Sequence, residues 1–272
     1  MTHSRVVVVT GASAGVGRAT ALAFARRGAA LGLIARRRNG LEATAREVRA
    51  IGARALVLPL DVADSDHVDG AADAVERELG GMDVWVNNAL LPWLSPVRRL
   101  RPAEFRRAAA TSYLGGVHGM LAAVHRMVPR NRGVIVQVGS SVAPAMPLWA
   151  AWRATKQAIQ GFIASLRSEL VHDQSQVRVT TVHLPELEPL PAGWTGRLPV
   201  QRPAPRVLPP EAAARAIVYA AEHDVGQDLV VGWSGSARRP EEARAAHRRR
   251  FRSGLRAWRA MRRWARRDGG RA

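Results

Sequence analysis

The segment with the clearest chemistry is a glycine-rich turn near the N-terminus, Thr10-Gly11-Ala12-Ser13-Ala14-Gly15-Val16-Gly17. It follows an apolar run, residues 5–10, and precedes a segment with helical spacing, residues 17–27. Glycines at such a turn let a diphosphate approach the helix N-terminus, where backbone N–H groups and the helix dipole bind negative charge. The pattern therefore predicts a dinucleotide-binding turn. Its predicted binding residues are Gly11, Ser13, Ala14, Gly15, Val16 and Gly17.

Three consecutive arginines, Arg36, Arg37 and Arg38, follow the next apolar run. In dinucleotide sites an acidic residue about 20 residues past the glycines holds a 2′-hydroxyl, whereas arginine accommodates a 2′-phosphate. This chain has no carboxylate among these residues, and the planar guanidinium of Arg36 can bind a phosphate through two hydrogen bonds. NADP(H) is therefore favoured over NAD(H). The alternative interpretation is a solvated charge run in an arginine-rich chain.

Strand-like and helix-like segments alternate along the chain, which is typical of a parallel sheet with helices on both faces. We expect one α/β domain of the Rossmann type, a doubly wound parallel sheet, over residues 1–237. The predicted strands are 5–10, 31–35, 55–60, 84–87, 134–138, 177–184 and 228–231, and the predicted helices are 17–27, 41–51, 68–79, 102–127 (one or two helices), 149–171 and 211–222. The proline-rich stretch 185–210 is expected to form a loop or lid.

Several motifs lie at the ends of these predicted strands. They are Asp61-Val62 after the third, Asn87-Asn88-Ala89 after the fourth, Val138-Gly139-Ser140 after the fifth, and Lys156 on the following helix. Together with the glycine turn they make residues 5–235 resemble the short-chain dehydrogenase/reductase family. The resemblance implies that Asp61 and Val62 flank the adenine and that Asn88 and Ala89 line the ribose. Two positions depart from the family: Leu90 replaces a usual glycine, and Leu184-Pro185-Glu186-Leu187 replaces a Pro-Gly pair.

The family uses Asn, Ser, Tyr and Lys for catalysis, and this chain matches only part of that set. Lys156 is the single lysine among 41 basic residues and stands where the family holds the nicotinamide ribose. Ser140 fits the serine position, with Ser141 as the neighbouring option. Trp152 occupies the tyrosine position in W-R-A-T-K, and Ser112 occupies the asparagine position.

The tryptophan has a chemical consequence. Indole donates a hydrogen bond but is no acid of useful strength, and losing a positioned general acid costs about 10²–10⁴-fold in rate. The chain has two tyrosines, Tyr113 and Tyr219. Tyr113 adjoins Ser112, and it would need an unusual rotation of its helix to replace the missing tyrosine. The ordinary tyrosine-based mechanism is therefore not expected.

The formal net charge of +19 is concentrated at the C-terminus, where residues 238–272 hold fourteen arginines against three acidic residues. Within residues 248–267, the apolar half of a helical wheel carries Phe251, Leu255, Trp258, Met261 and Trp264. A basic amphipathic segment of this kind suits an anionic membrane surface or an acidic partner. A disordered solubilising tail, or a tail docked on its own domain, is the alternative. The chain has no base-reading motif, so sequence-specific nucleic-acid binding is not expected.

Other classes are excluded by what the chain lacks. Without cysteine there is no disulfide framework and no thiolate metal site. His118, His125, His172, His183 and His223 lack metal-ligand spacing, so we interpret them as surface or satisfied core residues. No apolar run reaches the roughly 18 residues of a transmembrane helix, and the start of the chain lacks the pattern of a signal peptide. We therefore expect a cytoplasmic protein, with peripheral membrane association through the tail as the variant.

Two hypotheses follow. The first is an NADP(H)-dependent oxidoreductase acting on an unidentified carbonyl or alcohol, in which Ser140 orients the substrate and Lys156 holds the ribose. Its proton would come from water or an unassigned group. The second is a non-catalytic NADP(H)-binding sensor or accessory protein positioned by the basic tail. Related proteins pair through the helices that correspond to 102–127 and 149–171, so a homo-oligomer is expected in either case.

Overall fold

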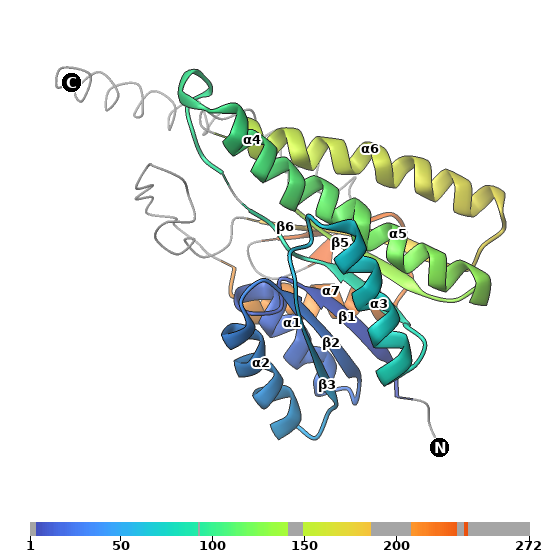
Figure 1. The fold of residues 1–272 in the computed structure, drawn as a ribbon. Helices are drawn as coiled ribbons and strands as arrows, with labels where there is room; N and C mark the ends of the chain where they lie inside the picture. The colour runs from blue at the N-terminus through green and yellow to red at the C-terminus, as the bar shows by residue number, and fades with distance from the viewer. Residues whose placement is uncertain (1–3, 92, 141–148, 186–207, 233–236, 239–272) are drawn as a thin grey trace.

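The computed structural model describes residues 4–91, 93–140, 149–185, 208–232 and 237–238, and these form a layered α/β structure (Figure 1). Its sheet has the strand order β3-β2-β1-β4-β5-β6-β7-β8. The strands are β1 (Val6–Thr10), β2 (Ala30–Ala35), β3 (Ala55–Pro59), β4 (Val84–Asn87), β5 (Val134–Ser140), β6 (Arg178–Leu184), β7 (Asp228–Val231) and β8 (Ala237–Arg238). The first seven are parallel. The expected Rossmann-type sheet is confirmed.

Helices cover both faces of this sheet. They are α1 (Gly15–Ala25), α2 (Arg38–Ala50), α3 (Ser65–Leu79), α4 (Pro102–Ala109), α5 (Gly115–Met127), α6 (Ala150–His172) and α7 (Pro210–Glu222). Figure 1 shows α1, α2 and α7 on one side and α3, α4, α5 and α6 on the other. The arrangement agrees with two separate apolar clusters, one on each side of the sheet.

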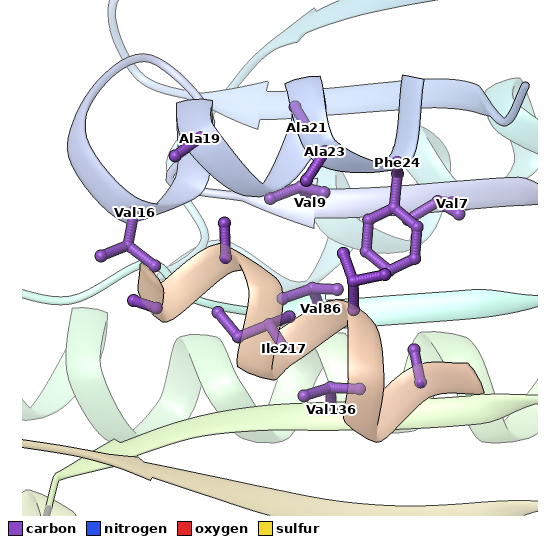
Figure 2. Packing of buried hydrophobic residues seen from close by; sticks show 14 of the residues in the cluster. Val7, Val9, Val16, Ala19, Ala21, Ala23, Phe24, Val86, Val136 and Ile217 are labelled. Carbon is purple, nitrogen blue, oxygen red and sulfur yellow. The ribbon is translucent and has the colours of Figure 1, made fainter. Parts of the chain in front are cut away.

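The valines of β1 show why the chain adopts this layered form. Val7 and Val9 belong to the apolar cluster beneath α1 and α7, whereas Val6 and Val8 belong to the cluster on the other face. All four are fully buried, as expected for a parallel strand covered on both sides. Figure 2 shows Phe24 of α1 lying close to Val7. Burying one side chain of this size contributes about 1.5–3 kcal/mol to stability.

Some predicted boundaries differ from the structure. Helix α2 begins at Arg38 instead of residue 41, so the arginine run enters its first turn. Helix α3 begins at Ser65, because the Asp64 carboxylate accepts hydrogen bonds from two backbone N–H groups of that turn. The helix predicted over 102–127 contains a π-helical turn, Ala110–Leu114, between α4 and α5. The short strand β8, antiparallel to β7, was not predicted.

The strand order places the candidate site. β1 pairs with β2 on one side and with β4 on the other. Strands β2 and β3 are therefore added on one side of β1, and the strands from β4 onward are added on the opposite side. Connections leaving the carboxyl ends of these two strands diverge, and ligands of open α/β sheets bind in the crevice that results. The glycine turn follows β1 and the Asn88-Ala89 segment follows β4. Both therefore lie at this crevice.

Candidate functional site

The glycine turn leaves no room for side chains at two of its positions. A Cβ atom on Gly17 would lie 2.1 Å from the carbonyl oxygen of Gly11, and one on Gly11 would lie 2.8 Å from Nδ2 of Asn88. Gly11 and Gly15 also have positive φ angles of 68° and 53°, which L side chains rarely adopt. At Gly15 the constraint is conformational alone, because nothing lies within 4 Å of the position of its Cβ. The turn therefore forms a cradle bounded by backbone.

A buried hydroxyl joins this turn to the end of β4. Oγ1 of Thr10 accepts hydrogen bonds from the backbone N–H groups of Asn88 (2.9 Å) and Ala89 (3.0 Å). Nδ2 of Asn88 donates in return to the carbonyl oxygen of Thr10 at 3.0 Å. The predicted ribose-lining residues are thus held directly against the predicted diphosphate turn. The sequence analysis did not assign Thr10, although its place as the last residue of the strand before a glycine was a usable signal.

The far side of the turn is held by α2. The hydroxyl of Thr44 donates to the carbonyl oxygen of Ala12 at 3.0 Å, and Gly40 packs closely against Ser13. Helix α1 begins at Gly15 after an Ala14 N-cap and has no acidic residue in its first turn. The positive end of the helix dipole therefore has no carboxylate of that turn beside it, which suits an anionic ligand. Together with the cradle, this geometry fits a dinucleotide diphosphate.

The three arginines past β2 have different surroundings. Arg36 directly follows the strand and is exposed, Arg37 is the N-cap of α2, and Arg38 pairs with Glu42 one turn on, at 3.5 Å. Of the three, Arg36 lies nearest the carboxyl end of β2. Its positive charge acts on the carboxylate of Asp61, which follows the neighbouring strand β3. Arg36 and Asp61 therefore share one end of the crevice.

Asp61 is already engaged by the protein. Nη2 of Arg107, on α4, lies 2.5 Å from Oδ2 of Asp61, and the backbone N–H of Ala63 donates to Oδ1 at 3.1 Å. Burial acts to raise the pKa of Asp61, but the hydrogen bonds from Arg107 and Ala63 and the charges of Arg107 and Arg36 outweigh it. The net pKa is lowered, so the carboxylate is ionised. Sequence reasoning missed Arg107, because no local pattern reports a pair 46 residues apart.

Val62 is fixed by the following helix. It is buried, and a Cβ on Gly115 would lie 2.5 Å from its side chain. Nδ1 of His118 lies 3.0 Å from the carbonyl oxygen of Val62. The glycine at the start of α5 and the histidine one turn later therefore hold the predicted adenine wall against the helix.

Ser112, at the predicted asparagine position, lies in the π-helical turn and is buried. Its hydroxyl accepts a hydrogen bond from the N–H of Leu91 at 2.9 Å and lies 3.3 Å from the carbonyl oxygen of the same residue, to which it donates. Ser112 thus holds the backbone just past Asn88 and Ala89. Tyr113 packs against the apolar cluster beneath α5 and α6.

Lys156 lies on α6 and reaches the end of β5. Its Nζ donates to the carbonyl oxygen of Val138 at 3.2 Å and lies 5.9 Å from the ring centroid of Trp152. Burial lowers the pKa of Lys156 to about 8. Trp152 in turn packs edge-on against Trp149, with ring centroids 5.1 Å apart. The lysine and the residue at the tyrosine position are therefore neighbours, and the group beside the ammonium is an indole.

Ser140 ends β5 beside a charged cluster that sequence reasoning did not find. Nδ1 of His183 lies 3.3 Å from the Ser140 carbonyl oxygen, and its Nε2 lies 3.1 Å from Oδ1 of Asp228. Arg167 approaches the same carboxylate at 3.7 Å. Burial acts to raise the pKa of Asp228, but the hydrogen bond and charge of His183 and the charge of Arg167 lower it overall.

Some predicted features lie outside the described residues: Ser141, Glu186-Leu187 and the basic segment 248–267. Among the residues that are described, no group of three or more His, Asp or Glu side chains could hold a metal ion. Within the same residues, no helix is both long and apolar enough to cross a membrane.

Comparisons with known proteins agree with the fold and the motifs. The family model of the short chain dehydrogenases matches residues 5–189, and the chain belongs to this family. It is similar to Uncharacterized oxidoreductase YxnA of Bacillus subtilis, with 30% identity over 238 residues that cover 86% of this chain and 67% of the relative. It is also similar to Uncharacterized oxidoreductase Mb1570 of Mycobacterium bovis, with 37% identity over 190 residues. That match covers 66% of this chain, and the chain spans about half (54%) of the length of this relative.

Solved structures show the same similarity. A metagenomic short-chain oxidoreductase in complex with NADP has a TM-score of 0.71 and 29% identity, and the match covers 84% of this chain and 96% of that one. An alcohol dehydrogenase from the archaeon Thermococcus sibiricus, complexed with 5-hydroxy-NADP, has a TM-score of 0.74 and 27% identity, with 87% and 99% covered.

Proposed function

We propose that this chain is an oxidoreductase that uses NADP(H), in preference to NAD(H), on a small carbonyl or alcohol substrate. The observation that carries the proposal is the backbone cradle formed by Gly11 and Gly17 at the start of α1, with Arg36 at the same edge of the sheet. Two similar structures are complexes with NADP or a derivative of it, which supports the choice of cofactor. When bound, the cofactor would supply or accept the hydride.

Each predicted residue then has a role that its surroundings allow. The turn from Gly11 to Gly17 would bind the diphosphate, and Arg36 the 2′-phosphate. The compact ammonium of Lys156 would hold the nicotinamide ribose. Ser140 would orient the substrate oxygen from the end of β5. Trp152 would supply no proton, so the proton would come from water or from another group.

The indole beside Lys156 also favours a second candidate function. A protein that binds NADP(H) without turning over a substrate needs the cradle, Arg36 and Lys156, but no acid at the position of Trp152. Such a protein would act as a sensor or an accessory to another enzyme, positioned by residues 248–267. Activity of the Trp152→Tyr variant separates the two candidates.

We also propose that the chain pairs with a second copy of itself. A hollow on the outer helical layer is lined by α5 and α6 side chains, among them Met120, Leu121, Phe162 and Leu166. Leu121 is 41% exposed although it is apolar, which supports pairing of two copies through these helices.

We further propose a domain over residues 1–237 followed by a basic tail, in a cytoplasmic protein that contacts an anionic membrane surface or an acidic partner through that tail.

Nucleotide titration tests the proposed cofactor directly. NADPH should quench tryptophan fluorescence at lower concentration than NADH, and Arg36→Asp should reverse that order, because a carboxylate repels a 2′-phosphate and accepts hydrogen bonds from a 2′-hydroxyl. Arg46→Asp makes the same charge change on the exposed face of α2 and should keep the original order. If neither nucleotide binds at millimolar concentration, both candidate functions are wrong.

A further inference from the structure

The ion pair between Asp61 and Arg107 closes one end of the crevice and brings charge from the α4 side of the sheet to the end of β3. The contact is short, 2.5 Å, and joins residues 46 positions apart in the sequence. Arg36 acts on the same carboxylate from the end of β2. Arg107 therefore contacts this carboxylate directly, and Arg36 follows the neighbouring strand and acts on it through its charge.

The negative charge of Asp61 would oppose the binding of a 2′-phosphate, and Arg107 offsets that charge. An unpaired Asp61 carboxylate would attract the Arg36 guanidinium and would also repel a 2′-phosphate. Two unit charges about 8 Å apart near a protein surface interact strongly enough to change an affinity roughly 2- to 30-fold. The ion pair with Arg107 offsets the negative charge of the Asp61 carboxylate. The Arg36 guanidinium then remains available to attract the 2′-phosphate. The three side chains together carry a net charge of about +1 in place of 0.

We propose that Arg107 is a specificity-determining residue, which favours NADP(H) over NAD(H) by neutralising Asp61 beside Arg36. The inference rests on the proposed function, because it assumes that Arg36 receives the 2′-phosphate. Arg107 acts through Asp61 and needs no contact with the nucleotide. The effect is therefore specific to the 2′-phosphate, and it disappears when residue 61 has no charge.

A purely structural role for the pair is a poor explanation of its position. The side chains of Arg107 and Asp61 are 39% and 30% exposed, and exposed pairs of this kind contribute little to stability. Nearby, Arg106 has the same side chain and is more exposed, and it forms no ion pair within the described part of the chain. Arg106→Met is therefore a matched control for Arg107→Met.

The experiment measures the dissociation constants of NADPH and NADH for purified full-length variants and compares their ratio. Arg107→Met should weaken NADPH binding by about 2- to 30-fold and change NADH binding much less, so the preference for NADPH falls. Arg106→Met should leave the ratio unchanged. The double variant Asp61→Asn/Arg107→Met should recover the ratio, because the repelling charge is gone. Thermal melting verifies that each variant is folded.

The outcomes distinguish this inference from the proposed function. If Arg36→Met lowers the NADPH preference but Arg107→Met does not, the role of Arg107 is overturned and the proposed cofactor stands. If the double variant remains as poor as Arg107→Met alone, Arg107 binds the phosphate directly and neutralisation of Asp61 is overturned. If Arg36→Met leaves the preference unchanged, the proposed phosphate site itself is wrong.

Discussion

The ammonium of Lys156 lies 5.9 Å from the ring centroid of Trp152, one helical turn earlier on α6. The family resemblance implies a tyrosine proton donor at that earlier position, with a pKa that the lysine would lower. Here the lysine faces an aromatic ring, which attracts a cation but has no acidic proton to release. Under the proposed function, the helix would keep the group that binds the ribose and would lack the group that moves the proton.

Replacing Trp152 with tyrosine tests whether that proton donor is all that is missing. We expect Trp152→Tyr to raise NADPH-dependent reduction of small aldehydes and ketones, by up to about 10²–10⁴-fold if the rest of the site is competent. The measurement is NADPH oxidation at 340 nm across a carbonyl panel. Trp149→Tyr makes the same ring change at the neighbouring position and should have no such effect. A Trp152→Tyr protein that binds NADPH and remains inert would favour the non-catalytic function.

The lowered pKa of Lys156 predicts a pH dependence of nucleotide binding. Its pKa is about 8 because of burial, so the side chain is an ammonium below that pH and a neutral amine above it. NADPH affinity should therefore fall as the pH rises through about 8, with the 2′-phosphate already ionised throughout. Isothermal titration between pH 7 and 10 measures this. Lys156→Met should bind more weakly at pH 7 and lack the step, and a step that persists in this variant would assign it to another group.

Gly17 is constrained by close contacts and Gly15 by its positive φ angle, so alanine substitutions at the two positions should differ in their effects. Gly17→Ala would place a methyl group 2.1 Å from a backbone oxygen, so the turn must open and NADPH binding should be lost. Gly15→Ala meets no protein atom within 4 Å, so its effect on folding comes only from its positive φ, a cost of about 1–2 kcal/mol. Its methyl group would still weaken NADPH binding, because it would occupy the side from which the diphosphate approaches. Thermal unfolding together with nucleotide titration compares them. Equal losses of stability in the two variants would contradict the close packing described for Gly17.

The cluster at the end of β5 predicts an acid-sensitive contribution to stability. The pKa of Asp228 is lowered in the folded state, chiefly by His183 and then by Arg167, against the effect of burial. Its contribution is therefore present above the pKa of an unfolded aspartate and is lost as the pH falls through the lower, folded value. Asp228→Asn should destabilise the protein by about 1–3 kcal/mol at pH 7.

The control for this prediction is Asp224→Asn, an exposed site where an amide oxygen can still accept the hydrogen bond from Gly226. Chemical denaturation at pH 7 and at pH 3 separates the two variants. The difference between wild type and Asp228→Asn should shrink at the lower pH. A constant difference at both values would show that the charge of Asp228 contributes nothing.

The alternation of strands and helices could be predicted because it depends on local patterns. The run of four valines in β1 predicts a strand that is buried on both faces. The amphipathic spacing of α2 and α3 predicts which face of each helix is buried, and the structure buries these residues. The π-helical turn at Ala110–Leu114 could not be predicted, because it depends on contacts such as that of Ser112 with Leu91, which lie 21 residues apart. The start of α3 was missed for a different reason: the capping role of Asp64 was overlooked, although its type and position were visible.

The same distinction applies to the site. Strand ends in a parallel sheet meet at one edge, so the glycine turn, Asp61 and Asn88 could be placed together from their order alone. The pairs Arg107–Asp61 and His183–Asp228 could not, because each joins residues more than 40 positions apart in the sequence. In an arginine-rich chain, the sequence does not show which arginines form ion pairs and which are only solvated.

The helical rod from α4 to α5 is continuous (Figure 1). It makes two of the contacts described above: Arg107 holds Asp61, and Ser112 holds Leu91. A fragment such as adenosine 2′,5′-bisphosphate that shifts this rod would alter the affinity for nicotinamide mononucleotide. Thermodynamic linkage requires the reverse influence to be equally large. The two halves of the nucleotide would then bind cooperatively even when no covalent bond joins them.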